Sequence, residues 1–246
     1  MSDLLIPAGW HAPSGIVAGC TTRLGGVSNG VYESLNLGGH VGDNSRAVVE
    51  NRKRFRTLCD LPAEPLWLNQ VHGCNIVRDP AVGAEADAAY TSLSDNVCVV
   101  MVADCLPVLF ASADGTEIAA AHAGWRGLAA GVLENSVAEF AAPAGDIMAW
   151  LGPAISSAEF EVGDEVRDAF CAFDEAAANC FRRNRRDRWQ ADLYGLARQR
   201  LERAGVGEIS GGEFCTYREP DRFFSYRRDG PCGRMAAFVF RRAADA

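Results

Sequence analysis

Residues 97–127 read VCVVMVADCLPVLFASADGTEIAAAHAGWRG, in which short polar segments separate three apolar runs. The runs Val97–Val102, Val108–Ala111 and Ile118–Ala121 have the length and residue types of strands. Their residues do not alternate between apolar and polar, as those of a strand with one solvated face would. The stretch therefore predicts strands that are buried on both faces.

The rest of the chain predicts further strands, and helices, around these three strands. Three further apolar runs predict strands at Gly15–Thr21, Ile147–Leu151 and Ala236–Phe240. Apolar residues at helical spacing predict helices over Leu128–Phe140, over Asp164–Phe173, and over Leu193–Leu201 with an end near Gly205. Isolated helices among strand pairs favour an α+β fold, with mixed β-sheets flanked by helices, over a regular βαβ winding.

The composition is that of a folded protein with a substantial core. The chain has 246 residues, 48% of them hydrophobic, and it has no low-complexity linker. We therefore predict a single catalytic domain over residues 1–246. The net charge of −8 argues against nucleic acid or an anionic membrane as a partner. Five arginines within residues 182–188 are a local exception, more typical of a solvated loop or helix face.

Three features favour a cytoplasmic location. No apolar run approaches the roughly 20 residues that span a bilayer, and the first residues lack the basic region of a signal peptide. Nine cysteines, an odd number without a CxxC pair, indicate reduced thiols. The sequence does not indicate an oligomeric state.

Potential metal ligands lie in three segments that each end an apolar stretch: Asn69–Gly73 (NQVHG), Ala103–Pro107 (ADCLP) and His122–Gly127 (HAGWRG). Their ligand residues are His72, Cys105 and His122. These are too far apart in the chain for a local zinc knuckle or a helical HExxH motif, so only tertiary structure could bring them together.

The residue types leave several interpretations open. If the three side chains converge, two imidazoles and one thiolate suit Zn²⁺ with an open fourth position, which is typical of a catalytic site. Without metal, His122 could activate Cys105 as a nucleophile, with Asp104 or Gln70 as the orienting group. A purely structural interpretation is a buried cysteine with two hydrogen-bonded histidines. His40 is a candidate fourth ligand, although a turn histidine more often has no metal role.

A different segment has the character of an anion site. Thr21–Ser28 (TTRLGGVS) joins a predicted strand to a glycine-bearing turn, and Arg23 within it could bind phosphate or carboxylate. The segment is neither a P-loop nor a GxGxxG fingerprint. A hairpin turn with an exposed arginine is the competing interpretation.

Taken together, these segments resemble a known family. The resemblance rests on TTRLGGVS and NQVHG, on the ADC and HAGWRG segments, and on Ser34–Gly38 (SLNLG), Glu50–Arg52 (ENR), Ala86–Ala88 (ADA), Leu151–Ile155 (LGPAI), Phe160–Gly163 (FEVG) and Ser225–Asp229 (SYRRD). The family was once called multicopper polyphenol oxidase or laccase-domain proteins. It is now described as purine nucleoside phosphorylases with adenosine deaminase activity, and it includes the bacterial peptidoglycan editing factor.

The resemblance implies a zinc site formed by His72, Cys105 and His122. It also implies the mixed-sheet fold shared with the deamidase domain of cytotoxic necrotizing factor. The implied substrates are adenosine, inosine or S-methyl-5′-thioadenosine together with phosphate, and Asn36 becomes a candidate substrate-binding residue. Multicopper oxidation is unsupported, because four histidines cannot supply a blue-copper centre and a separate multi-histidine cluster. Copper could still replace zinc at the same three ligands.

The implied reactions assign provisional roles to individual residues. For phosphorolysis, Arg23 is our candidate phosphate clamp and Arg126 a second one. For deamination of adenosine, Asp104 is the nearest acid in sequence, although it would point away from the metal if the strand continued regularly through Cys105. Alternatives are amide hydrolysis on a peptidoglycan precursor at the same zinc site, a metal-free Cys–His hydrolase, and a non-catalytic zinc-stabilised binding protein.

Overall fold

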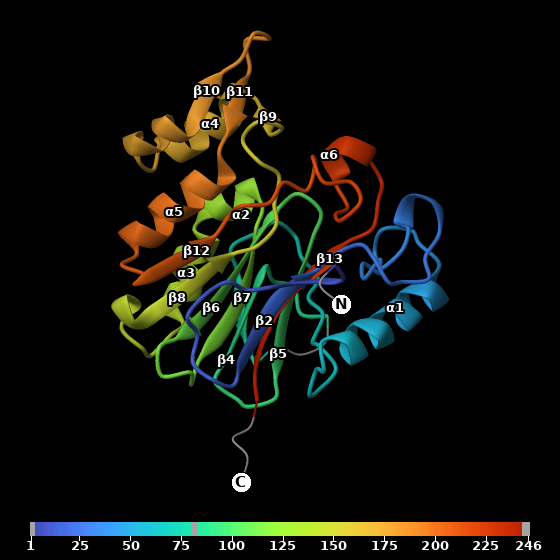
Figure 1. Ribbon diagram of the computed structural model, residues 1–246. Helices are drawn as coiled ribbons and strands as arrows, with labels where there is room; N and C mark the ends of the chain where they lie inside the picture. The colour runs from blue at the N-terminus through green and yellow to red at the C-terminus, as the bar shows by residue number, and fades with distance from the viewer. Residues whose placement is uncertain (1–2, 80–82, 243–246) are drawn as a thin grey trace.

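Two β-sheets packed face to face form the centre of the protein (Figure 1), whose computed structural model describes residues 3–79 and 83–242. The smaller, fully antiparallel sheet has the order β1–β2–β13–β5, with bounds Leu5–Pro7, Ile16–Thr21, Met235–Arg241 and Val97–Val102. The larger sheet has the order β12–β8–β6–β7–β4–β3, with bounds Glu208–Gly211, Ile147–Leu151, Leu106–Ser112, Ile118–Ala123, Ala88–Thr91 and Ile76–Arg78. Its β12–β8 and β3–β4 pairs are parallel and the others antiparallel. The predicted α+β class with mixed sheets is confirmed, and each of the six predicted strands is present.

Alternating side chains of the strands divide the apolar core into three layers. All six residues of β5 are buried, as predicted for a strand covered on both faces. Cys98, Val100 and Val102 pack between the two sheets, whereas Val97, Val99 and Met101 pack in the outer layer. Strands β6 and β7 divide in the same way between the central layer and a third layer beyond the larger sheet. Because neighbouring layers share strands, we retain one domain as our interpretation.

Helices cover the outer faces of both sheets (Figure 1). Helix α1 (Ser45–Leu58) packs Phe55 onto Phe238 of the smaller sheet, with the ring centroids 5.4 Å apart. Helices α2 (Trp125–Ala130), α3 (Val132–Ala138) and α5 (Leu193–Arg203) cover the larger sheet on the opposite side. The side chain of Asn44 caps α1, and that of Asp192 caps α5.

One helix prediction needs correction, and one helix was missed. The predicted helix over Leu128–Phe140 is two helices, because Gly131 between them has a φ of 95° and ends the first one in a left-handed conformation. Helix α1 was not predicted. It is charged along most of its length and buries only Val48, Asn51 and Phe55, so its apolar stripe is too sparse to stand out in the sequence.

A small third sheet lies at one end of the molecule, at the top of Figure 1. Its strands have the order β10–β11–β9, with bounds Phe181–Arg183, Trp189–Ala191 and Glu161–Val162. Helix α4 (Asp164–Cys171) begins at the predicted residue but ends two residues before Phe173. The arginine-rich run forms the β10–β11 hairpin, and all five arginines are exposed, which confirms the solvated interpretation. Within the described ranges, no helix is long and apolar enough to cross a membrane.

Candidate metal centre and active-site cavity

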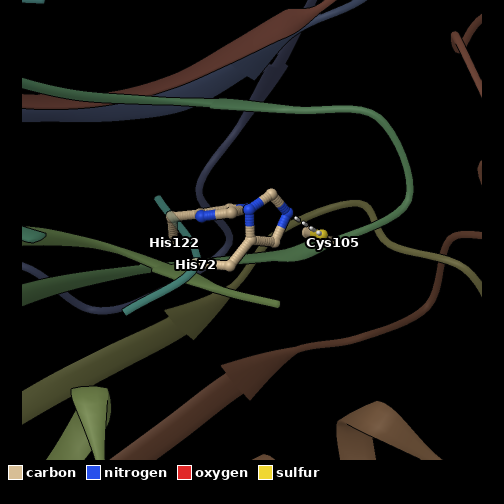
Figure 2. Close-up of side chains that lie close together, drawn as sticks. All are labelled: His72, Cys105 and His122. Atoms are coloured by element: carbon tan, nitrogen blue, oxygen red, sulfur yellow. Dashed lines mark hydrogen bonds between the residues drawn. The ribbon is translucent and has the colours of Figure 1, made fainter. Parts of the chain in front are cut away.

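His72, Cys105 and His122 meet at one end of the two packed sheets (Figure 2). His72 lies in the loop before β3, Cys105 in the turn between β5 and β6, and His122 near the end of β7. One ligand atom from each side chain lies within 4.8 Å of the others. The Cys105 Sγ is 3.9 Å from the His72 Nε2, and the two imidazole centroids are 4.8 Å apart. Within the described part of the chain, this is the one group of three or more His, Cys, Asp or Glu residues placed to hold a metal ion.

The turn at residues 103–105 explains how the cysteine reaches this position. β5 belongs to the smaller sheet and ends at Val102, whereas β6 belongs to the larger sheet and begins at Leu106. The chain therefore crosses between the sheets within three residues, and Asp104 has a φ of 88°. The strand does not continue through Cys105, so Asp104 does not point away, and both residues line the same cavity.

Two glycines of the HAGWRG segment are required by close packing. A Cβ atom at Gly124 would lie 3.0 Å from the Cys105 Sγ and 3.1 Å from the His72 Cδ2. A Cβ atom at Gly127 would lie 2.5 Å from the carbonyl oxygen of Gly73. The first turn of α2 can therefore approach the cluster and its supporting loop only because these positions carry no side chain.

Asp87, which we had not singled out, organises the cluster. Its buried carboxylate accepts a hydrogen bond from the His122 Nδ1 at 2.8 Å. The same carboxylate accepts the backbone N–H groups of Val71, His72 and Gly73 at 3.2, 2.9 and 2.6 Å. It thereby orients one imidazole, leaves the His122 Nε2 for the cluster, and fixes the loop that carries the other imidazole. The orienting group is thus neither Asp104 nor Gln70, whose amide instead binds the backbone of Met101.

Cys105 and His122 shift each other's pKa toward the charged form. Burial alone would raise the pKa of Cys105, but the positive charge of His122 and hydrogen bonds from both histidines lower it to about 6. Burial alone would lower the pKa of His122, but the Cys105 thiolate and the Asp87 hydrogen bond raise it to about 9. Cys105 is therefore a thiolate at neutral pH, which is the form that binds a metal or attacks an electrophile.

A cavity of about 470 Å³ opens onto the cluster. Its wall combines three arginines and a histidine with aromatic and aliphatic side chains: Arg126, Arg227, Arg234 and His40, and Trp125, Ile155, Phe160 and Tyr226. Among its described lining residues the one carboxylate is Asp104, which accepts hydrogen bonds from the Thr216 hydroxyl at 2.6 Å and the Arg227 N–H at 2.7 Å. The cavity is therefore suited to an anionic ligand that also presents an apolar or aromatic face.

The predicted substrate-binding residues are not all in this cavity. Arg126 lines it, stacks over the Trp125 ring at 4.3 Å, and has no ion-pair partner among the described residues. Arg23 is not among the residues that line it, and its guanidinium donates to the carbonyl oxygens of Glu33 and Pro220. Asn36 is also outside, and its fully buried amide is used in internal hydrogen bonds.

The other two histidines are not ligands of this cluster. His40 lines the cavity but is not one of the three grouped ligands, so the candidate fourth ligand is not part of the cluster. Burial and the charges of Arg234 and Arg52 hold the pKa of His40 below its usual value. His11 is exposed and pairs with Glu208.

Comparison with known proteins places this site in a family. A model of the multi-copper polyphenol oxidoreductase laccase family matches residues 17–242. The chain belongs to this family. The resemblance inferred from the sequence motifs is therefore confirmed.

Curated relatives of the chain carry a different activity in their names. "Purine nucleoside phosphorylase YfiH" of Escherichia coli (strain K12) is 53% identical, over 98% of this chain and 99% of its own length. "Purine nucleoside phosphorylase PA4543" of Pseudomonas aeruginosa is 49% identical, over 94% of this chain and 96% of its own. Among solved structures, Neisseria meningitidis protein NMB0706 has a TM-score of 0.93 and 48% identity, covering 98% of this chain and 100% of its own.

Proposed function

We propose that this protein is a zinc-dependent purine nucleoside phosphorylase that also deaminates adenosine. The observation that carries the proposal is the His72–Cys105–His122 cluster at the base of a cavity with cationic and aromatic walls. The names of the curated relatives support the reaction class. The proposed substrates are adenosine, inosine and S-methyl-5′-thioadenosine, with phosphate as the second substrate.

The donor set fits zinc. Two imidazoles and one thiolate are ligands that Zn²⁺ prefers, and three protein ligands with an open fourth position are typical of a catalytic site. Asp87 adds the carboxylate–histidine contact that commonly supports such sites. When bound, zinc supplies a Lewis acid that can activate water or polarise the leaving group. Copper(II) also favours nitrogen and sulfur donors and is the alternative metal.

The remaining residues bind the substrates and handle the proton. In phosphorolysis a phosphate oxygen bonds to C1′ as the C1′–N9 bond breaks, and the proton lost by the phosphate ends on the purine. We assign binding of the anionic substrate to Arg126, because this residue lines the cavity and has no ion-pair partner among the described residues. We assign the proton transfer to Asp104, because it is the one carboxylate among the described residues that line the cavity.

The same residues can serve deamination. Water adds to C6 of adenosine, ammonia leaves, and inosine is the product. Asp104 would then carry the proton from the attacking water to the departing nitrogen. Both reactions need an aromatic surface for the purine, which Trp125, Phe160 and Tyr226 offer in the cavity wall.

The test is an activity assay on zinc-quantified protein. Inosine or adenosine is incubated with and without phosphate, and free base and ammonia are followed by chromatography. We expect phosphate-dependent hypoxanthine or adenine from the wild type and none from Cys105→Ala. Cys171→Ala, which changes a partly buried cysteine of α4, is the matched control and should remain active. If neither nucleoside is consumed although one zinc per chain is bound, amide hydrolysis on a peptidoglycan precursor replaces this proposal.

A second candidate is a metal-free Cys–His hydrolase. The observation that favours it is the arrangement of three side chains. Asp87 accepts a hydrogen bond from His122, whose ring nitrogen lies within 4.8 Å of the Cys105 Sγ, and this matches the order of an orienting acid, a base and a nucleophile. It predicts turnover of an amide or acyl substrate that survives complete metal removal and is abolished by alkylation of Cys105. Loss of all turnover on metal removal, with recovery on adding zinc, would exclude it.

A further inference from the structure

We propose that Arg234 binds the phosphate in this cavity together with Arg126, and that the buried Asn36 holds Arg234 in position. The inference rests on the proposed phosphorolysis and assigns its anion subsite. Arg234 follows Gly233 directly before β13, and its side chain lines the cavity beside the His–Cys–His cluster.

The backbone of Arg234 is fixed on both sides. Its N–H donates to the Asn36 Oδ1 at 2.9 Å, and its carbonyl oxygen accepts the N–H of Leu37 at 3.1 Å. The Asn36 Oδ1 also accepts the N–H of Gly38 at 2.9 Å, while its Nδ2 donates to Asp43 at 2.9 Å. Asn36 is fully buried, so this support is not exchanged for water.

The stem of the side chain is also confined. A Cβ atom at Gly38 would lie 2.8 Å from the Arg234 Cγ, so the arginine stem packs directly against this glycine. The Arg234 Nη1 donates to the carbonyl oxygens of Cys232 and Gly233 at 2.9 and 3.0 Å. Backbone, stem and one end of the guanidinium are therefore held before any ligand arrives, which lowers the entropic cost of binding.

The free donors of Arg234 match an oxyanion. Its Nε and Nη2 have no hydrogen-bond partner among the described residues, and these two atoms form one edge of the guanidinium fork, which binds two phosphate oxygens at once. Arg126, which lines the same cavity, also has no side-chain hydrogen-bond partner among the described residues, whereas two arginines that do not line it use their donors within the protein. Arg228 donates to three carbonyl oxygens and a carboxylate, and Arg52 directs its Nε and Nη2 to the Leu37 carbonyl.

The surroundings of Arg234 favour an anion. His40 lines the same cavity, and its imidazole offers an N–H donor to an anion. Asp104 has each carboxylate oxygen on a hydrogen-bond donor, which reduces its repulsion of an incoming phosphate. A carboxylate of a peptide substrate has similar chemistry, so the experiment must separate phosphate from carboxylate.

The test uses Arg234→Met, which keeps an unbranched stem against Gly38 and removes the guanidinium. With inosine saturating, we expect the KM for phosphate to rise about 10- to 100-fold, the range that follows from losing hydrogen bonds between charged groups. The KM for inosine, measured at saturating phosphate, should change less than twofold. Arg242→Met is the matched control, because Arg242 is exposed and pairs with Asp60, and it should leave both KM values unchanged.

Direct binding separates this inference from the proposed function. Titration of the zinc-loaded wild type with inorganic phosphate, followed calorimetrically, should show binding that Arg234→Met weakens by the same factor, whereas acetate should not compete at equal concentration. A wild type that binds phosphate through Arg234 but consumes no nucleoside would refute the phosphorylase and leave the subsite standing. A phosphorylase whose phosphate KM is unchanged in Arg234→Met, or whose inosine KM rises instead, would overturn the subsite. Acetate competing as well as phosphate would also overturn it, in favour of a carboxylate site.

Discussion

Replacing Asp87 with asparagine tests the central claim about how the cluster is built. The carboxylate accepts four N–H donors, from His122, Val71, His72 and Gly73. Asparagine has the same shape but offers one acceptor oxygen and one amino group. In either orientation, the amino group faces two of the four donors, so about half of the hydrogen bonds are lost.

The magnitude follows from the number of bonds lost. Hydrogen bonds to a charged group are each worth about 1.5–3 kcal/mol, so two of them amount to about 3–6 kcal/mol of local support for the loop and the imidazole. Part of this loss is recovered by relaxation of the loop. Changes to partners that orient metal-bound histidines typically reduce metal affinity about 10- to 100-fold, and we expect Asp87→Asn to fall in this range.

The assay is zinc affinity by competition with a chromogenic chelator, together with thermal unfolding of the metal-free protein. Asp114→Asn is the matched control. Asp114 is exposed, accepts hydrogen bonds from Ser112 and Thr116, and lies in the β6–β7 turn at the opposite end of those strands from the cluster. It should leave zinc affinity unchanged. If Asp87→Asn is folded and binds zinc as tightly as the wild type, the orienting role of Asp87 is refuted.

Three further predictions concern individual side chains. In the metal-free protein, iodoacetamide should modify Cys105 readily at pH 7, and the rate should fall as the pH drops through about 6, because the thiolate is then protonated. His122→Asn should raise the pH at which the rate is half its maximum. An unchanged midpoint would contradict the effect of His122 on the Cys105 pKa. Gly124→Ala should weaken zinc binding while changing the temperature of thermal unfolding little, because the added methyl group meets Cys105 and His72. Zinc affinity equal to that of the wild type, measured by calorimetry, would argue against this packing. Arg23→Ala should lower the free energy of unfolding, measured by urea titration, by about 1–3 kcal/mol, because two hydrogen bonds are lost. The KM for phosphate should stay unchanged. A raised KM would show that Arg23 takes part in phosphate binding.

The strands could be predicted because their signal is local. All residues of β5 and the first six residues of β13 are buried, so these runs are continuously apolar and stand out in the sequence. Helix α1 escaped prediction because its contact with the sheet uses only a few residues, Phe55 chief among them. The break at Gly131 was also missed. Apolar residues keep their helical spacing in the sequence on both sides of this single left-handed residue, so the spacing does not reveal that two helices meet there.

The site was predictable in its chemistry and not in its arrangement. His72, Cys105 and His122 were identified by residue type and by the resemblance to a family, and the structure brings them together. Arg23 and Asn36 have suitable donors for a substrate, but their own chain already uses those donors. Nothing local distinguishes a guanidinium that is bound to backbone carbonyls from one that is free, because the carbonyls come from distant residues.

The sequence by itself determined the α+β class, the buried strands and the two imidazoles and thiolate that a metal prefers. These properties depend on backbone periodicity and on the chemistry of single side chains. Only the tertiary structure decided that Asp87 orients the cluster and that Arg234, held by Asn36, keeps free donors in the cavity. Both assignments depend on which distant groups are brought within hydrogen-bond distance when the two sheets pack, and short-range patterns do not encode that.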